Sequence, residues 1–121
     1  MPNIKFIYLY RDGGNYKKWG EVIFRNPDEL SCDFMAEALR KAFIQDGLFV
    51  AHQVRIPDSF LYTRGEAKSD DHCYHEFDRV ELSPDTPDDL HGRSIKQFLV
   101  EVQMQSTNGW TAFDPHESVQ H

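Results

Sequence analysis

Residues 4–10 read Ile-Lys-Phe-Ile-Tyr-Leu-Tyr. The β-branched and aromatic residues of this stretch favour a strand, and because both alternating faces are largely apolar, we expect a central strand covered on both sides. Residues 11–15, Arg-Asp-Gly-Gly-Asn, follow with strong turn chemistry, and residues 21–24, Glu-Val-Ile-Phe, resume a strand. The simplest arrangement is an antiparallel hairpin with a long polar loop from Arg11 to Gly20.

An amphipathic helix is predicted over residues 31–45. Its apolar residues recur at helical spacing, and they are Phe34, Met35, Ala38, Leu39, Ala42 and Phe43. Ser31 or Asp28 can cap the start of the helix, and Gly47 can end it. We expect the apolar side of this helix, Phe34 included, to lie against the sheet.

A second helix is predicted to begin after Ser94, because Ser94 and Gln97 have the spacing of a capping box. Apolar residues follow at positions i, i+3, i+4 and i+7, namely Ile95, Phe98, Leu99 and Val102. A strand with alternating apolar residues over the same segment is the competing interpretation, and the cap favours the helix. Asn108 and Gly109 end the helix, and Trp110 and Phe113 could hold the following segment against the core.

The remaining strands are predicted over residues 49–56 and 73–82, which gives the order β-β-α-β-β-α. This order predicts an α+β fold, with an antiparallel or mixed sheet of three to four strands packed with two helices. A length of 121 residues fits one domain, which we place at residues 1–115. Residues 116–121 are expected to fray as a C-terminal tail.

Negative charge is concentrated in the middle of the chain. The whole sequence has 13 basic and 20 acidic residues, a net charge of −7. Residues 66–91 alone hold nine acids and two bases, so this segment carries the entire excess. Such a segment suits a basic protein partner, a cation, or plain solubility. Nucleic-acid binding is disfavoured because it depends on a basic surface, and no large cluster of lysine and arginine occurs.

The sequence favours a cytoplasmic protein with no membrane span. No apolar run approaches 18 residues, and the first residues lack the basic segment and cleavage site of a signal peptide. The two cysteines, Cys32 and Cys73, form no C-x-x-C pair and fit a reducing compartment.

The 11–20 loop is the first candidate binding site. Arg11 could hold a carboxylate or phosphate through two hydrogen bonds, and Tyr16 or Trp19 could stack on a planar group. The candidate ligand-binding or partner-binding residues are Arg11, Asp12, Asn15, Tyr16, Lys17 and Trp19. A simpler alternative is a structural turn in which Asp12 and Asn15 bond to their own backbone. The loop matches neither of the glycine-rich phosphate-binding motifs G-x-x-x-x-G-K-[ST] and G-x-G-x-x-G.

Residues 70–78 form the second candidate site, because they offer seven metal-ligating side chains in nine residues. His72, His75 and Glu76 are the candidate ligands of a divalent metal, with any further ligand supplied from elsewhere. Residues three apart on a regular strand point to opposite faces, so the two histidines converge only on a turn or a helix. A mixed strand with surface histidines is the alternative.

Two segments carry a resemblance to a known family. Residues 8–17, Y-L-Y-R-D-G-G-N-Y-K, and residues 71–77, D-H-C-Y-H-E-F, resemble a family of small bacterial proteins that share Y-L-Y-R-D-x-x-N-Y-K and D-H-x-x-H-E-F segments. The resemblance implies a small cytoplasmic bacterial protein and brings no activity with it. It draws attention to one set of residues in the two segments, namely Arg11, Asp12, Asn15, Tyr16, Lys17, His72, His75 and Glu76.

Two functional hypotheses follow from the sequence. The first is a non-enzymatic binding module that contacts a protein partner, for which a basic protein is the expected class, through the 11–20 loop and the acidic 66–91 surface. An immunity or antitoxin-like protein that blocks a basic nuclease would fit this description. The alternative is a metal-dependent hydrolase or small-ligand-binding enzyme built on residues 70–78. The oligomeric state is open.

Overall fold

The computed structural model describes residues 2–63 and 65–117. Its strands are β1 (Asn3–Arg11), β2 (Lys17–Phe24), β3 (Leu48–Phe49) and β4 (His75–Ser83), and its helices are α1 (Cys32–Ala42) and α2 (Ile95–Asn108). Two short 3-10 turns, η1 (Gln45–Gly47) and η2 (Ala51–Val54), flank β3. The protein is therefore a single small α+β domain, as the sequence predicts.

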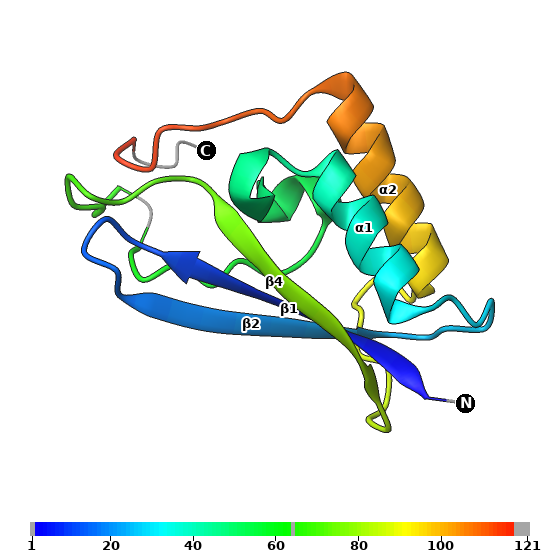
Figure 1. Ribbon diagram of the computed structural model, residues 1–121. Helices are drawn as coiled ribbons and strands as arrows, with labels where there is room; N and C mark the ends of the chain where they lie inside the picture. Colours follow the sequence, from blue (N-terminus) through cyan, green and yellow to red (C-terminus); the bar gives the residue numbers. More distant parts are fainter. Residues whose placement is uncertain (1, 64, 118–121) are drawn as a thin grey trace.

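The four strands form one antiparallel sheet in the order β2-β1-β4-β3. The central strand is β1, and its residues Ile4 and Phe6–Tyr10 are all buried. One face of β1 joins the main core, and both helices lie over that face (Figure 1). This arrangement confirms the prediction that residues 4–10 form the middle of the sheet.

Local capping explains where the two helices start. The Ser31 hydroxyl accepts a hydrogen bond from the Phe34 amide at the start of α1. At the start of α2, Ser94 and Gln97 form the predicted capping box, with each side chain accepting from the other residue's amide. These bonds satisfy backbone amides that have no partner within the helix.

One part of the predicted apolar stripe of α1 is wrong. Met35, Leu39 and Ala42 are buried against the sheet, whereas the Phe34 side chain is 55% exposed. A helix turns by about 100° per residue, so Phe34 lies beside the stripe centred on Leu39 rather than within it. It borders the gap between α1 and α2 instead.

The strand predicted at residues 49–56 is also wrong beyond its first residue. β3 ends at Phe49, and residues Ala51–Val54 form the 3-10 turn η2. Arg55 then adopts a left-handed conformation with φ 60°. Ala51 and Val54, three residues apart, both enter the core, which a helical turn allows and a strand does not.

The core continues past α2 into the C-terminal segment. The Trp110 ring contacts the Phe43 ring, and its indole N–H donates to the Ala42 carbonyl at 3.1 Å. The tail predicted at residues 116–121 falls partly on described residues: His116 contacts Asp114 and the Lys68 carbonyl, while 118–121 lie outside the described residues. In the described part of the chain, no helix has the length and apolar character needed to cross a membrane.

Candidate functional site

The β1–β2 connection is shorter than the sequence predicts. Pairing continues to Arg11 opposite Lys17, so the turn comprises residues 12–16 rather than 11–20. Lys17 and Trp19 therefore belong to β2, and Trp19 pairs with Leu9. Residues 17–20 are largely exposed because they lie in β2, which is an edge strand of the sheet. Polar residues such as lysine are common on exposed edge strands.

The turn itself is held by its own polar groups. The Asp12 carboxylate accepts from the Tyr16 amide at 2.9 Å, and the Asn15 amide donates to the Asp12 carbonyl at 3.0 Å. Asn15 is left-handed with φ 68°, a conformation that asparagine tolerates well. Arg11 donates to the Asn15 side chain. Asp12 and Asn15 thus perform the structural role expected of turn residues, and Tyr16 remains 73% exposed.

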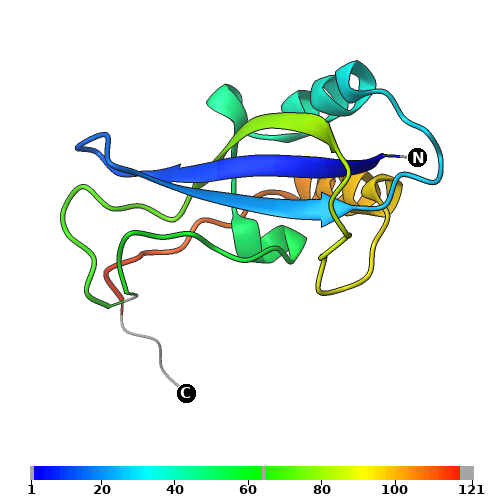
Figure 2. The same cartoon turned by 90° about the horizontal axis from the view of Figure 1, so that it is seen from below.

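The segment before β4 docks directly onto this turn. The Gly13 amide donates to the Asp70 carbonyl at 2.9 Å. A Cβ atom on Gly13 would lie 2.8 Å from the Asp70 Cβ, so this close approach requires glycine. Figure 2 shows the β1–β2 hairpin and the loop before β4 at the same end of the sheet. The two candidate regions of the sequence are therefore one surface.

Two side chains of β1 fix the same segment. The Tyr10 hydroxyl donates to the Asp71 carboxylate at 2.6 Å, and the Arg11 guanidinium makes two hydrogen bonds to Glu76, at 3.3 and 3.1 Å. Burial, reinforced by the bond to Asp71, strongly raises the pKa of Tyr10. The Tyr10 hydroxyl therefore remains a donor at physiological pH. The rings of Phe60 and Tyr62 pack against Tyr10.

His72 has no free ring nitrogen. Its Nε2 lies 2.7 Å from the Arg11 carbonyl, and its Nδ1 accepts from the Tyr74 amide at 3.0 Å. Since a carbonyl can only accept, Nε2 carries the proton in this arrangement. His72 thus ties the segment before β4 to the end of β1.

His75, the first residue of β4, points into the core. It is fully buried among the rings of Tyr8, Tyr10, Phe49 and Phe60. Its Nε2 accepts from the Ser59 amide at 2.8 Å, and among the described residues its Nδ1 has no hydrogen-bond partner. Burial, with a smaller contribution from His72, lowers the pKa of His75 to about 4. The neutral imidazole is therefore part of the core.

The three candidate metal ligands do not face a common point. His75 lies in the core, Glu76 is paired with Arg11, and both nitrogens of His72 are hydrogen-bonded. In the described part of the chain, the residues close enough to share a cation are Asp12, Asp70 and Asp71, with carboxylate oxygens within 4.8 Å of one another. These oxygens would suit a hard cation such as Mg²⁺ or Ca²⁺ rather than zinc. Both Asp71 oxygens already accept hydrogen bonds, from Tyr10 and from the Lys68 amide.

The acidic 66–91 segment is not one surface. Its C-terminal part serves the fold: Asp89 pairs with Arg93 at 2.9 Å and Asp88 accepts from the Ile23 amide at 2.8 Å. Its middle part contributes Asp78 and Glu81, which both pair with Arg79. Asp70 and Asp71 lie at the hairpin end, where among the described residues neither has a lysine or arginine within ion-pair distance.

A groove crosses the outer face of the sheet beside this end. It has a volume of about 410 Å³, and its lining residues are Lys5, Ile7, Trp19, Gly20, Glu21, Arg79 and Glu81. Trp19 is 52% exposed on one side of the groove. Lys5 is paired with Glu21 at 3.3 Å, so the charges here are largely matched.

No protein-family model matches the chain, and no curated protein or solved structure matches it. The site is accordingly defined by its own geometry. We name the side chains of Asp12, Tyr16, Asp70 and Asp71 the tip surface; Tyr16 and Asp70 are exposed, whereas Asp12 and Asp71 are half-buried. Tyr10 was not among the sequence-predicted site residues; Asp70 was predicted only as a member of the 70–78 segment and of the acidic 66–91 surface, and the structure shows that it reaches the hairpin.

Proposed function

We propose that the protein is a non-enzymatic binding module whose tip surface engages basic side chains of a protein partner. The observation that carries this proposal is the docking of Asp70 onto Gly13, which sets the Asp12, Asp70 and Asp71 carboxylates within 4.8 Å of one another. Like charges at such distances repel each other. A cationic group that binds between the carboxylates relieves this repulsion, so its binding free energy is more favourable than at an isolated carboxylate.

The supporting hydrogen bonds are made before any partner arrives. Tyr10 holds Asp71, the Tyr16 amide holds Asp12, and the Asp70 backbone is fixed on Gly13. Ordering these groups therefore adds little cost to association. Tyr16 and Trp19, both more than half exposed, add aromatic side chains of the kind that dominate protein interfaces.

The histidines support a binding role over a catalytic one. General acid–base catalysis requires a titratable group within reach of a substrate, usually with a pKa near the working pH. His75 is buried with a pKa of about 4, and both ring nitrogens of His72 bond to the backbone. Neither is available to a substrate in this arrangement.

The partner that fits is a protein with an exposed cluster of arginine or lysine. An immunity or antitoxin-like role, in which the tip surface covers the basic surface of a nuclease, is the form of this proposal that matches the acidic composition. The proposal places this binding in a bacterial cytoplasm, in keeping with the two unpaired cysteines, Cys32 and Cys73.

A charge-matched comparison tests the proposal. Calorimetric titration with a hexa-arginine peptide compares the double variant Asp12→Asn/Asp70→Asn with Asp28→Asn/Asp46→Asn. Both variants lose two negative charges, and Asp46, at φ 67°, accepts asparagine without strain. We expect the tip variant to bind the peptide about tenfold more weakly and the control variant to bind within about twofold of the wild type.

Two results would contradict the proposal. Equal losses in both double variants would assign peptide binding to net charge alone, and an unaltered affinity in the tip variant would assign it to another surface. A parallel titration with calcium or magnesium chloride distinguishes a metal site from a protein-binding site. Saturable one-to-one binding of the cation that is lost in Asp12→Asn/Asp70→Asn would show that the tip surface binds a cation instead.

A further inference from the structure

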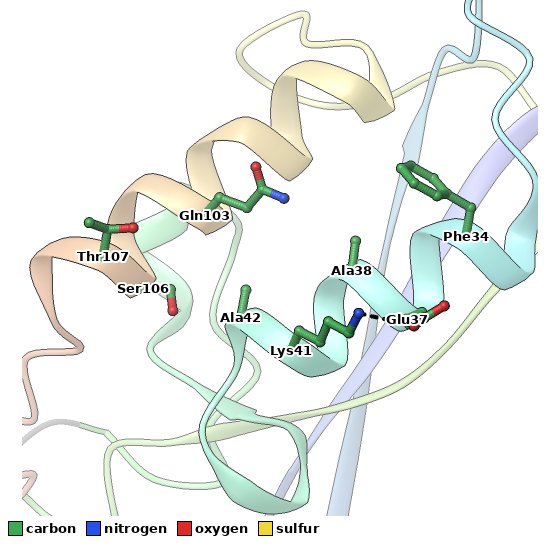
Figure 3. Close-up of a pocket in the computed structure, with 8 residues that line it drawn as sticks. All are labelled: Phe34, Glu37, Ala38, Lys41, Ala42, Gln103, Ser106 and Thr107. Atoms are coloured by element: carbon green, nitrogen blue, oxygen red, sulfur yellow. Dashed lines mark ion pairs between the residues drawn. The ribbon is translucent and has the colours of Figure 1, made fainter.

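A groove separates α1 and α2 on the side of the helix layer that faces away from the sheet (Figure 3). Its volume is about 570 Å³, and α1 contributes Phe34, Ala38 and Ala42 while α2 contributes Gln103, Ser106 and Thr107. At its rim, Lys41 and Glu37 form an ion pair at 3.1 Å. Two small alanines thus form an open hollow, and Phe34 projects at one end of it.

The apolar surface extends beyond this groove. A second hollow of about 280 Å³ shares Gln103 and Thr107 with the first and adds Val100 and Met104. Val100 is 49% exposed, Met104 is 53% exposed and Phe34 is 55% exposed. The two hollows meet at the polar residues Gln103 and Thr107, with exposed apolar side chains on either side. Large exposed apolar side chains gathered on one part of a small protein mark an interaction surface.

The charge of the helix layer permits a second copy of this acidic chain as the occupant. Of the charged residues on the two helices, Asp33, Glu37 and Glu101 are acidic and Arg40, Lys41 and Lys96 are basic, so the helix layer sums to zero. The whole chain carries −7. Two copies of the chain repel each other wherever acidic faces meet, and the helix layer is a face on which they can approach without that cost. A basic partner, in contrast, is drawn toward the acidic regions of the chain.

We propose that this groove is the interface of a symmetric dimer, occupied by α1 of a second copy. A two-fold axis near Ala38 sets the two α1 helices antiparallel, with Phe34 of each copy over Ala42 of the other. The same pairing brings Glu37 of one copy toward Lys41 of the other, so the charges that pair within a helix also match across the axis. Two-fold interfaces require this kind of self-complementary patch.

The dimer leaves the hairpin end uncovered. The helices lie over one face of the sheet, whereas the β1–β2 turn extends beyond the sheet's end, away from α1 (Figure 1). Each dimer therefore presents two tip surfaces. Dimer formation does not depend on the proposed binding function, and it can be tested without any partner.

Sedimentation equilibrium of the full chain over a concentration series tests the dimer. We expect the wild type to approach twice its 14.2 kDa mass at high concentration. Phe34→Glu, at an exposed helical position, should weaken the dimer at least about tenfold while circular dichroism shows an intact fold. Leu90→Glu is the matched control, because Leu90 is 83% exposed outside the helices, and it should leave the dimer unchanged.

Charge exchange provides the second test. Lys41→Glu should weaken the dimer, and the double variant Glu37→Lys/Lys41→Glu should restore it, because the reversed pair matches across the axis as the original does. A wild type that stays monomeric at every concentration would overturn the proposal and leave the groove to a different partner. A dimer that tolerates Phe34→Glu as well as it tolerates Leu90→Glu would overturn it by placing the interface elsewhere.

Discussion

The two ends of the acidic segment have opposite relations to the fold. Asp89, at the C-terminal end, is nearly inaccessible and paired with the equally buried Arg93. Burial alone would raise the pKa of Asp89, but hydrogen bonds from Arg93 outweigh burial and lower it. Asp70, at the N-terminal end, is exposed beside Asp12 and Asp71. A negative charge in the sequence therefore does not by itself indicate a binding surface.

This difference separates residues that build the domain from residues that it displays. Arg93 connects Asp89 to the Val54 and Arg55 carbonyls and stacks over the Phe24 and Phe98 rings. At the other end, the backbone of Asp70 contributes to the fold while its carboxylate faces solvent. The predictions that follow test this division, beginning with the largest expected effect.

Of the proposed substitutions, replacing Arg93 should lower the free energy of unfolding most. Arg93→Ala leaves the buried Asp89 carboxylate without its partner, for which we expect a loss of about 3–5 kcal/mol in the free energy of unfolding. Arg79→Ala, which removes exposed ion pairs of β4, should cost less than about 1 kcal/mol. Urea denaturation measures both, and similar losses for the two variants would contradict the structural role of the Arg93 pair.

Acid should destabilise the protein through His75. Its pKa is about 4 in the folded state and near 6.5 when unfolded, so the unfolded state binds the proton first. Stability is therefore complete above pH 6.5 and falls as the pH drops toward 4, by roughly 3 kcal/mol in total. Urea denaturation at stepped pH should show this loss in the wild type and a correspondingly smaller one in His75→Gln. If the free energy of unfolding fell equally with pH in the two proteins, His75 would not be the cause of the acid destabilisation.

A methyl group on Gly13 should loosen the hairpin end. Gly13→Ala places a Cβ 2.8 Å from the Asp70 Cβ, whereas Gly14→Ala meets its nearest atom at 3.4 Å. We expect Gly13→Ala to cost about 1–3 kcal/mol, since inserting a methyl group into a tight contact forces the backbone apart. Gly14→Ala should cost clearly less. Thermal denaturation compares the two, and equal costs would show that the segment before β4 is not held against the turn.

Neutralising the tip should change stability least. Asp70→Asn removes one charge from an exposed cluster, so we expect a change within about 0.5 kcal/mol, toward greater stability. Asp89→Asn, the same chemical change at the other end of the segment, should destabilise the protein because it weakens a buried pair. If chemical denaturation ranked the two variants in the reverse order, the contrast between the two ends would be wrong.

Much of the fold could be predicted because its signals are local. The capping box at Ser94 and the Ser31 cap each act within one helical turn, and the structure confirms both. The apolar spacing of α1 is confirmed at Met35, Leu39 and Ala42. Residues 49–56 were mispredicted because a short apolar run satisfies a strand pattern and a 3-10 turn equally well. Phe34 was placed in the stripe because it is apolar, although the helical turn of about 100° per residue sets it beside the residues that face the sheet.

The candidate site depends on strand register and was only partly predictable. Composition singled out residues 11–20 and 70–78 as candidate sites, but the contact between the two segments follows from the antiparallel pairing of β1 with β4. His72 and His75 looked like ligands because the sequence does not show the backbone carbonyl and amide groups that bond to them. Burial, which removes His75 from any surface chemistry, is likewise a property of the assembled core.

Amide hydrogen exchange at Gly13 tests the central claim most directly. The Gly13 amide donates to the Asp70 carbonyl across the junction between the turn and the segment before β4, whereas the Gly14 amide has no backbone acceptor within the described residues. If the two segments form one surface, Gly13 should exchange at least about tenfold more slowly than Gly14 after correction for intrinsic rates. Equal exchange at the two glycines would show that the turn moves independently of Asp70, and the tip surface would not exist as described.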